Sequence, residues 1–339
     1  MDNVTHDDAK RPLVSVEHLK VHFPVQKGVF AKTVGIVKAV DGISFVIPRG
    51  SVFALVGESG CGKTTTAQTI AGLVNATSGS VNLSFSHTDT VLFSWNNADA
   101  RQARQARRNM QFIFQDPYSS LNPRMSVQSI IEEPLIIHRL GTKKERLDRI
   151  NELLAQVGLS QEYLTRYPHE FSGGQRQRIG IARALATRPE FIIADEPVSA
   201  LDVSIQAQII NLLQQLKNQL SQTQLFISHD LAVVRHIADT IAVMYRGKIV
   251  ESGREKDLFD HPFHPYTHLL LESVPVPGKG RLKRKTQKSA DDAVSSEIPP
   301  GCAFYPRCPR RRDVCRETIP ALESTNDTTH TVACFNRIE

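Results

Sequence analysis

A short glycine-rich run that ends in a lysine and a threonine has the composition of a loop that binds phosphate groups. It follows the apolar residues 51–56 and precedes a stretch at 64–73 that is expected to be helical. Glycine tolerates backbone angles that a Cβ atom disfavours, so successive N–H groups can turn toward phosphate oxygens at a helix N-terminus. Lys63 would reach the β- and γ-phosphates of a nucleotide, and the Thr64 hydroxyl would bind Mg²⁺. The sequence therefore predicts a P-loop here, against the alternative of a glycine-rich turn without a ligand. The residues expected to contact the nucleotide through this loop are Gly57, Ser59, Gly60, Cys61, Gly62, Lys63, Thr64 and Thr65.

Two adjacent carboxylates follow another apolar run, 191–194. Parallel sheets bind ligands at the carboxyl edge of their strands, so we expect Asp195 and Glu196 to lie beside the P-loop. Asp195 would bind Mg²⁺ directly or through water, and Glu196 would polarise the water that attacks the γ-phosphate. An acidic pair is also typical of a helix N-terminus, and only the preceding P-loop favours the catalytic interpretation.

Two further polar residues are expected at strand ends. Gln115 follows the apolar run 110–114, and its amide would sense the γ-phosphate or bind Mg²⁺. His229 follows the run 225–228 and would contact both the γ-phosphate and the attacking water. The alternatives are an exposed loop glutamine and a structural histidine. With Glu196 and Lys63, these two residues make up the predicted catalytic set.

A second glycine-based anion site is predicted at the start of the helix expected at 174–186. Its residues are Ser172, Gly173, Gly174 and Gln175. A single nucleotide already has its P-loop, so a second phosphate-binding helix start indicates that ATP lies between two such domains. Each domain would then cover the nucleotide of the other.

The C-terminal region concentrates the cysteines Cys302, Cys308, Cys315 and Cys334. A cytosolic chain would not usually keep such a set as disulfides, so metal or cluster ligation is the leading interpretation. A four-cysteine set can hold Zn²⁺ or an iron–sulfur cluster, although zinc sites more often use tight Cys-x₂₋₄-Cys spacings that this region lacks. The remaining cysteine, Cys61, is interpreted as a tolerated small residue of the P-loop.

The elements that must position these residues alternate between strands and helices, which is typical of a parallel sheet covered on both faces. Strands are expected at 14–23, 81–85, 110–114, 191–194, 225–228, 240–245 and 248–251, with a loop containing Pro24 and Gly28 after the first. A hairpin of 43–47 and 51–56 is expected to deliver the P-loop. Helices are expected at 64–73, 98–108, 174–186, 203–220 and 231–238, and a short one after His264. Helices at 127–140 and 143–157 would form an insertion between Gln115 and Ser172.

Composition and charge exclude several classes of protein. With 40% apolar and 22% charged residues over 339 positions, the chain is not disordered. Residues 1–10 lack the features of a secretory signal, and no apolar run approaches the roughly 18 residues of a membrane helix. Any membrane role is therefore expected to come through partner subunits. The basic clusters at 101–108 and 279–288 carry no interleaved aromatic residues, so a solvated helix face and a solvated linker are favoured over binding of nucleic acid or anionic lipid.

These motifs together resemble the ATP-binding subunits of ABC transporters, over roughly residues 13–255 and in the order of that family. Residues 57–64 are similar to its Walker A motif, 172–175 to its signature and 191–196 to its Walker B motif, while Gln115 and His229 match its Q-loop and switch histidine. The resemblance implies an α/β fold with a P-loop (RecA-like) core, an antiparallel β edge, a helical insertion and a small C-terminal domain. It also implies ATP and Mg²⁺ as cofactors and an ATPase coupled to transport. Further, it implies that Phe23 stacks on adenine, where the family often has tyrosine, and that Asp202 in the D-loop belongs to the nucleotide-binding residues.

A narrower resemblance, to the importers of dipeptides, oligopeptides and nickel, covers residues 115–124, 166–171, 264–267 and 300–304. Such importers pair two types of ATPase subunit, and the residues Arg124 and Gln175 at their positions resemble one of these types more than the other. The resemblance implies a heterodimer with a second ATPase subunit, two transmembrane permease subunits and, indirectly, an extracytoplasmic solute-binding protein, without a nucleic-acid partner. The chain would then lie peripherally on the cytoplasmic face of the cytoplasmic membrane. The implied solutes are di- and oligopeptides, with nickel chelates, glutathione and antimicrobial peptides as alternatives.

The same resemblance implies that the four C-terminal cysteines hold a structural [4Fe–4S] cluster, with zinc or reduced thiols as alternatives. The expected domains are a nucleotide-binding domain at 13–260, with its insertion at about 116–172, and a C-terminal domain at 261–339. The latter contains a linker at 275–300 and a cysteine-rich segment at 301–335. A soluble ABC ATPase is disfavoured because the sequence shows neither a second nucleotide domain nor a long coiled-coil insertion. An exporter ATPase is disfavoured by the His-Pro-Tyr segment at 264–266 and by the cysteines.

Overall fold

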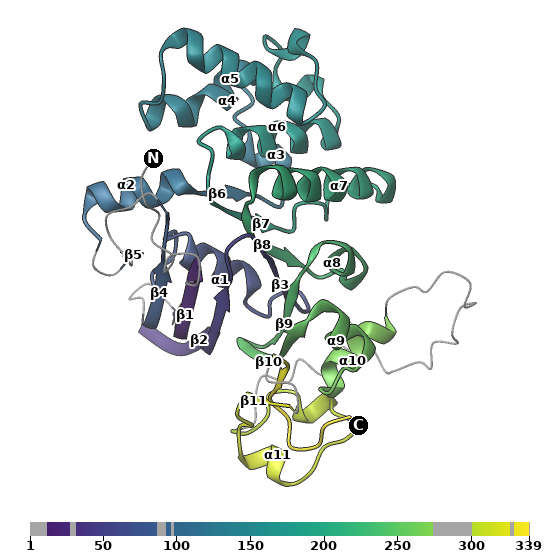
Figure 1. Cartoon of the computed structure of the whole chain (residues 1–339). Coiled ribbons are helices and arrows are strands. Elements are labelled where there is room, and N and C mark those ends of the chain that lie inside the picture. Colours follow the sequence, from purple (N-terminus) through teal and green to yellow (C-terminus); the bar gives the residue numbers. More distant parts are fainter. Residues whose placement is uncertain are drawn as a thin grey trace.

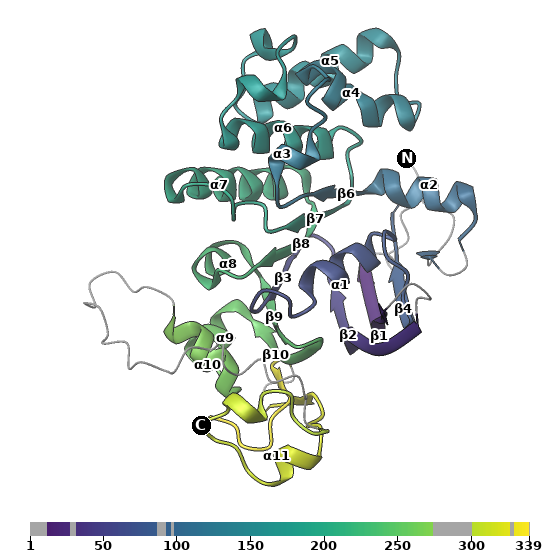
Figure 2. The ribbon, with the colours of Figure 1, turned by 180° about the vertical axis from the view of Figure 1, so that it is seen from behind.

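The computed structural model describes residues 12–27, 32–86, 93–95, 98–273, 300–325 and 329–338. Within these ranges the chain forms two sheets with helices packed around them (Figures 1 and 2). Residues 1–10, Gly28, most of the predicted linker and the basic cluster at 279–288 lie outside the described residues. The expectations placed on them therefore stay predictions.

The larger sheet has the strand order β11-β12-β10-β9-β3-β8-β7-β6. Its strands β6, β7, β8, β3 and β9 run parallel, and β9 and β10 pair antiparallel around Arg246 and Gly247. The strands of this sheet are β3 (Val52–Val56), β6 (Met110–Ile113), β7 (Phe191–Asp195), β8 (Thr223–Ser228), β9 (Thr240–Tyr245), β10 (Lys248–Arg254), β11 (Glu323–Ser324) and β12 (Thr331–Val332).

The smaller sheet is antiparallel, with the order β2-β1-β4-β5, and confirms the predicted β edge. Its strands are β1 (Val14–Lys27), β2 (Lys32–Ile47), β4 (Ser78–Leu83) and β5 (Phe93–Ser94). Strand β1 continues through Pro24, where the sequence predicted a loop.

The predicted hairpin of 43–47 and 51–56 is wrong. Residues 43–47 belong to β2, which pairs with β1, whereas β3 lies between β8 and β9 in the larger sheet. The turn at Pro48 and Gly50 therefore carries the chain from one sheet to the other. Because both faces of β3 are buried, its apolar side chains gain more from a central position in the larger sheet than from a two-stranded pairing.

The helices agree with the predicted alternation. They are α1 (Lys63–Ile70), α2 (Ala100–Asn109), α3 (Pro117–Ser120), α4 (Val127–Ile137), α5 (Lys143–Gln156), α6 (Gly173–Leu185), α7 (Val203–Leu220), α8 (Leu231–Ile237), α9 (Glu255–Asp260), α10 (Pro265–Glu272) and α11 (Val314–Glu317). Short 3₁₀ turns lie at Gln161–Tyr163, Pro168–Glu170 and Tyr305–Arg307. In Figures 1 and 2, α4 and α5 lie at one end of the molecule and the C-terminal segment lies at the opposite end.

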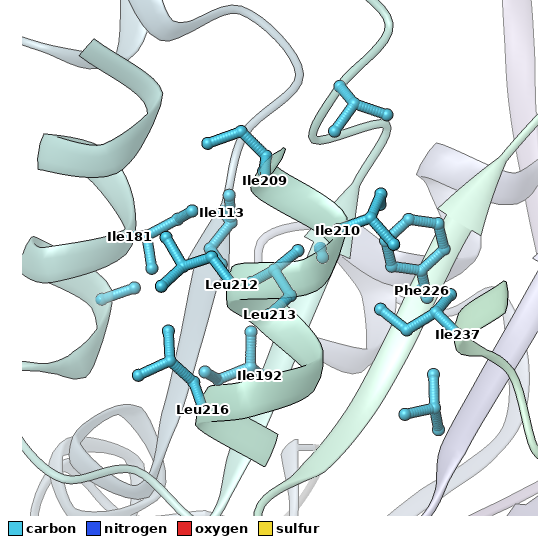
Figure 3. Close-up of a cluster of buried hydrophobic side chains, with 14 of the residues drawn as sticks. Ile113, Ile181, Ile192, Ile209, Ile210, Leu212, Leu213, Leu216, Phe226 and Ile237 are labelled. Atoms are coloured by element: carbon cyan, nitrogen blue, oxygen red, sulfur yellow. The ribbon is translucent and has the colours of Figure 1, made fainter. Parts of the chain in front are cut away.

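Two apolar cores sandwich the larger sheet. Alternate residues of β3 point to opposite faces, with Ala54 in one core and Leu55 in the other. Helix α7 covers one face through Ile209, Leu213 and Leu216, which belong to the same apolar core as Ile192 of β7 (Figure 3). Helix α1 and the antiparallel sheet cover the other face. This double cover fixes the carboxyl ends of the parallel strands, where the predicted site residues lie.

Candidate active site

A cavity of about 1180 Å³ opens at the carboxyl edge of the parallel strands. This volume exceeds the roughly 300–1,000 Å³ of common small-molecule sites. It brings together residues of the P-loop, strand ends and the C-terminal segment. Its lining residues include Gly57, Ser59, Gly60, Gly62, Lys63, Thr64, Thr65, Gln115, Glu196 and His229. The sequence-predicted catalytic set thus converges on one cavity.

The P-loop conformation requires glycine at two positions. Gly57 has φ 153° and Gly62 has φ 110°. A Cβ atom at Gly57 would lie 2.2 Å from the carbonyl oxygen of Met244, and one at Gly62 would lie 2.2 Å from that of Ala39. The loop is therefore pressed against the β2 and β9 strands, and Gly62 caps helix α1 at the cavity.

Lys63 is buried and its ammonium donates to the backbone of its own loop. Nζ donates to the carbonyl oxygens of Gly57 at 2.7 Å and Glu58 at 3.0 Å. The neighbouring Cys61 does not line the cavity, and its N–H donates to the carbonyl of Glu58. Burial raises the pKa of the Cys61 thiol. The thiol is therefore a small packed group here, and Cys61 is not among the lining residues although the sequence predicted that it contacts the nucleotide.

Two of the three predicted Mg²⁺ ligands, Thr64 and Asp195, lie in contact, whereas the Gln115 amide donates to Glu196. The Thr64 hydroxyl donates to Oδ1 of Asp195 at 3.2 Å. Burial raises the pKa of the Asp195 carboxyl to about 6, and the nearby Glu196 adds to this effect. A buried carboxylate beside a hydroxyl is a hard oxygen donor pair, which suits Mg²⁺. The positive charge of such an ion would favour the ionised form of Asp195.

Glu196 is held at the end of β7 by residues from the two adjacent strands. The Gln115 amide donates to its Oε2 at 3.0 Å, and Nδ1 of His229 lies 3.1 Å from the same oxygen. Glu196 itself has φ 45°, an uncommon angle for a residue with a side chain. Its carboxylate is mostly buried and faces the cavity, where it can orient and polarise a water molecule.

Several predicted nucleotide contacts do not line this cavity. Phe23 is 42% exposed, and it is its cross-strand partner Val37 that lines the cavity. Ser172 begins helix α6 and accepts a hydrogen bond from the N–H of Gln175. Gly174 packs against Ile205 of α7, where a Cβ atom would meet a side-chain carbon at 2.5 Å. The predicted nucleotide-binding residues that do not line the cavity are Phe23, Cys61, Ser172, Gly173, Gly174, Gln175 and Asp202.

The four C-terminal cysteines line one small cavity together with His264 and Phe304. Burial raises the pKa of the Cys302 and Cys308 thiols, and that of Cys334 to about 11. Among the described residues, no three His, Cys, Asp or Glu side chains are arranged to hold a metal ion. The structure thus gathers the cysteines without placing them as ligands of a single ion.

Sequence reasoning missed the C-terminal contribution to the larger cavity. Leu270, Gly301 and Ile319 line it, although they lie far along the chain from the P-loop. Arg307 pairs with Glu58 inside the P-loop. The His-Pro-Tyr segment was singled out in the sequence, yet nothing in its pattern indicates that Tyr266 contacts the P-loop.

Comparisons with known proteins agree with this geometry. Residues 40–199 match the family described as "ABC transporter", and residues 250–315 match "Oligopeptide/dipeptide transporter, C-terminal region". The chain is 48% identical to the oligopeptide transport ATP-binding protein AppF of Bacillus subtilis, over 95% of this chain and 96% of that relative. It is 51% identical to the oligopeptide transport ATP-binding protein OppF of the same organism, over 83% of this chain and 88% of OppF.

The fold also matches a solved structure. The post-hydrolysis dimer of the ATP-binding cassette MJ0796, bound to ADP and Pi, superposes with a TM-score of 0.61 at 28% identity, over 71% of this chain and 98% of that one. The match confirms the predicted α/β fold of a nucleotide-binding cassette. Separately, none of the helices that the structure describes has the length and apolar character needed to cross a bilayer.

Proposed function

The chain belongs to the family of ATP-binding subunits of ABC oligopeptide and dipeptide transporters, and from this premise we propose which of its residues bind and hydrolyse ATP. It is an ATPase coupled to transport and energises peptide import. The observation that carries the residue assignment is the convergence of Gln115 and His229 on one oxygen of Glu196, beside the P-loop.

In the proposed reaction, the P-loop N–H groups and Lys63 bind the phosphates of ATP. Thr64, Asp195 and Gln115 would hold Mg²⁺, which would neutralise charge on the phosphates. Glu196 orients the attacking water and accepts its proton, while His229 and Gln115 keep the carboxylate in place. Phe23 is proposed to stack on adenine through a movement of the β1–β2 hairpin, since Val37 opposite to it already lines the cavity.

We propose that a second, homologous ATPase subunit completes the site. Ser172, Gly173, Gly174 and Gln175 do not line the chain's own cavity, and the exposed Ser172 at this helix start suits contact with a nucleotide held by a partner. Asp202, also exposed, begins α7 near this surface. Two permease subunits would receive the closure of this dimer, with the chain peripheral on the cytoplasmic face of the membrane. An external solute-binding protein would deliver the peptide.

The division into a nucleotide-binding domain at 13–260 and a C-terminal domain at 261–339 is part of the proposal. Separate family matches at 40–199 and 250–315 support it.

For the cysteine cavity we propose a [4Fe–4S] cluster of structural role. Four cysteine thiols line one small cavity, and four cysteine thiolates are the usual ligand set of such a cluster. A cluster would stabilise these thiols as thiolates, which burial otherwise disfavours. Zinc and reduced thiols are the alternatives.

Uptake of labelled peptides by a strain that lacks this gene tests the function. Wild-type protein is expected to restore uptake of di- and oligopeptides, whereas Lys63→Ala should not. If the protein restored uptake of a nickel chelate or glutathione but not of peptides, that compound would be the solute in place of peptides. Purification without any membrane protein would instead favour a soluble ABC ATPase.

A further inference from the structure

The C-terminal segment forms part of the wall of the nucleotide cavity. Leu270 of α10 lies on that wall together with residues that follow residue 299 in the chain. The latter are Pro300, Gly301, Ala303 and Ile319. The cavity that binds nucleotide is therefore not built by the cassette core alone.

Glu58, the second residue of the P-loop, is held by this segment at two points. Its carboxylate accepts two hydrogen bonds from Arg307, with Nη1 to Oε2 and Nη2 to Oε1 both at 2.8 Å. Its backbone N–H donates to the hydroxyl oxygen of Tyr266 at 3.0 Å. The Glu58 carbonyl accepts from Lys63. Side chain, N–H and carbonyl of this one loop residue are all engaged.

The two contacting residues are themselves firmly supported. Tyr266 is fully buried, and its ring centroid lies 4.6 Å from that of Tyr245 and 5.4 Å from that of Phe304. The Arg307 guanidinium lies 5.8 Å from the ring centroids of both Tyr245 and Phe304. Its hydrogen bonds to Glu58 raise the pKa of Arg307. A bidentate arginine held by aromatic rings fixes direction as well as charge.

The local sequence explains how Tyr266 reaches the loop. His264 begins α10, and its Nδ1 accepts the N–H of Tyr266 at 3.0 Å. Burial lowers the pKa of His264 to about 4, so the ring stays neutral and Nδ1 can accept. Pro265 sets the backbone angle of the first helical position. The His-Pro-Tyr order thus aims a hydroxyl at the P-loop.

We propose that Arg307 and Tyr266 are positioning residues of the ATP site, which act through Glu58 to hold the P-loop in its phosphate-binding shape. The proposal rests on the proposed ATP-binding function. It makes the C-terminal domain a determinant of nucleotide affinity in this chain. Neither residue lines the cavity itself; each fixes the loop residue that precedes the N–H groups expected to bind phosphate.

A double-mutant cycle separates this role from a simple effect of charge. If charge alone acted, Glu58→Gln would remove a negative group near the phosphates and tighten ATP binding, whereas Arg307→Gln would weaken it. Positioning predicts that both single changes weaken binding, by roughly threefold to tenfold, and that the double variant is no weaker than either one. Arg307→Lys keeps the charge but loses the bidentate geometry, so it should restore binding only in part.

The measurement is the dissociation constant of a non-hydrolysable ATP analogue with Mg²⁺ for the full chain, by calorimetry. Arg316→Gln is the matched control, because Arg316 is exposed and lies in the same small domain. Tyr266→Phe, which removes only the hydroxyl, should weaken binding in the same way as Glu58→Gln. Circular dichroism and thermal unfolding check that each variant is folded.

Opposite signs for Glu58→Gln and Arg307→Gln, or affinities within twofold of the control, would overturn the positioning role. Failure of the wild-type chain to bind the analogue is a different result, because it would refute the proposed ATPase function itself.

Discussion

Nδ1 of His229 lies 3.1 Å from Oε2 of Glu196, and the two residues end adjacent parallel strands, β8 and β7. The same oxygen accepts a hydrogen bond from the amide of Gln115, which follows β6, the next strand of the sheet. Three neighbouring strand ends therefore fix one carboxylate oxygen. This arrangement leaves the other oxygen, Oε1, to interact with water, and it leads to the first two predictions.

Replacement of Glu196 by glutamine should leave ATP binding intact and lower turnover by at least about a hundredfold, because the amide cannot accept a proton from water. Steady-state ATPase rates and analogue binding measure the two effects separately. Turnover close to the wild-type rate would remove Glu196 from the catalytic role.

Single variants His229→Ala and Gln115→Ala should each lower turnover by about tenfold or more, since either leaves the Glu196 carboxylate less well placed. Because both residues act on one oxygen, the double variant should lose less than the product of the two single effects. Fully multiplicative losses in the ATPase rate would indicate independent roles.

Ser172→Arg should leave analogue binding by the isolated chain unchanged, because Ser172 does not line the chain's own cavity. The assembled heterodimer should lose turnover at the partner's nucleotide, where the added side chain would block closure. Weaker binding by the isolated chain would contradict the proposed division of the two sites.

The cysteine cavity is tested by metal content. Protein purified without oxygen should contain iron and sulfide with the absorption of a [4Fe–4S] cluster, and Cys308→Ser or Cys334→Ser should reduce it. Cys61→Ser is the control, since Cys61 lies in the P-loop and away from this cavity. One zinc per chain without iron would support the alternative.

A buried carboxylate fastens the C-terminal segment to the larger sheet. Glu251 on β10 accepts the N–H groups of Phe263 at 2.7 Å and His264 at 2.9 Å, and His330 Nε2 lies 2.8 Å from it. Glu251→Ala should lower the free energy of unfolding by about 3 kcal/mol, because it leaves these buried groups without a partner. The exposed pair of Glu323 and Arg337 offers the control: Glu323→Ala should cost less than about 1 kcal/mol. Denaturant unfolding compares the two variants, and equal costs would argue against the buried network.

The site could largely be predicted from sequence because each component is local. Gly57 to Thr64, Gln115, Glu196 and His229 each directly follow or adjoin a short apolar run, and such runs are recognisable as buried strands. Parallel pairing then brings their carboxyl ends to one edge. The prediction of a hairpin at 43–56 was wrong because strand pairing is not a local property. Its turn residues fit a hairpin equally well, and the choice between β1 and β3 as partner for β2 depends on contacts distant in sequence.

The C-terminal contacts left no comparable signal. Strands β11 and β12 have two residues each, too few for a periodic pattern. Arg307 and Glu58 carry opposite charges, as many distant pairs in this chain do, and only the folded arrangement selects this pair. Packing between segments remote in sequence determines both the pairing of β11 and β12 and the contact of Arg307 with Glu58.

Strand β12 extends the larger sheet beyond β10, with residues 331 and 332 opposite 252 and 251. During synthesis on the ribosome, β10 emerges long before β12, so the nascent protein carries an unprotected edge in the interval. Exposed edges invite pairing with other chains. Truncation or stalling before residue 331 should therefore yield an aggregation-prone cassette.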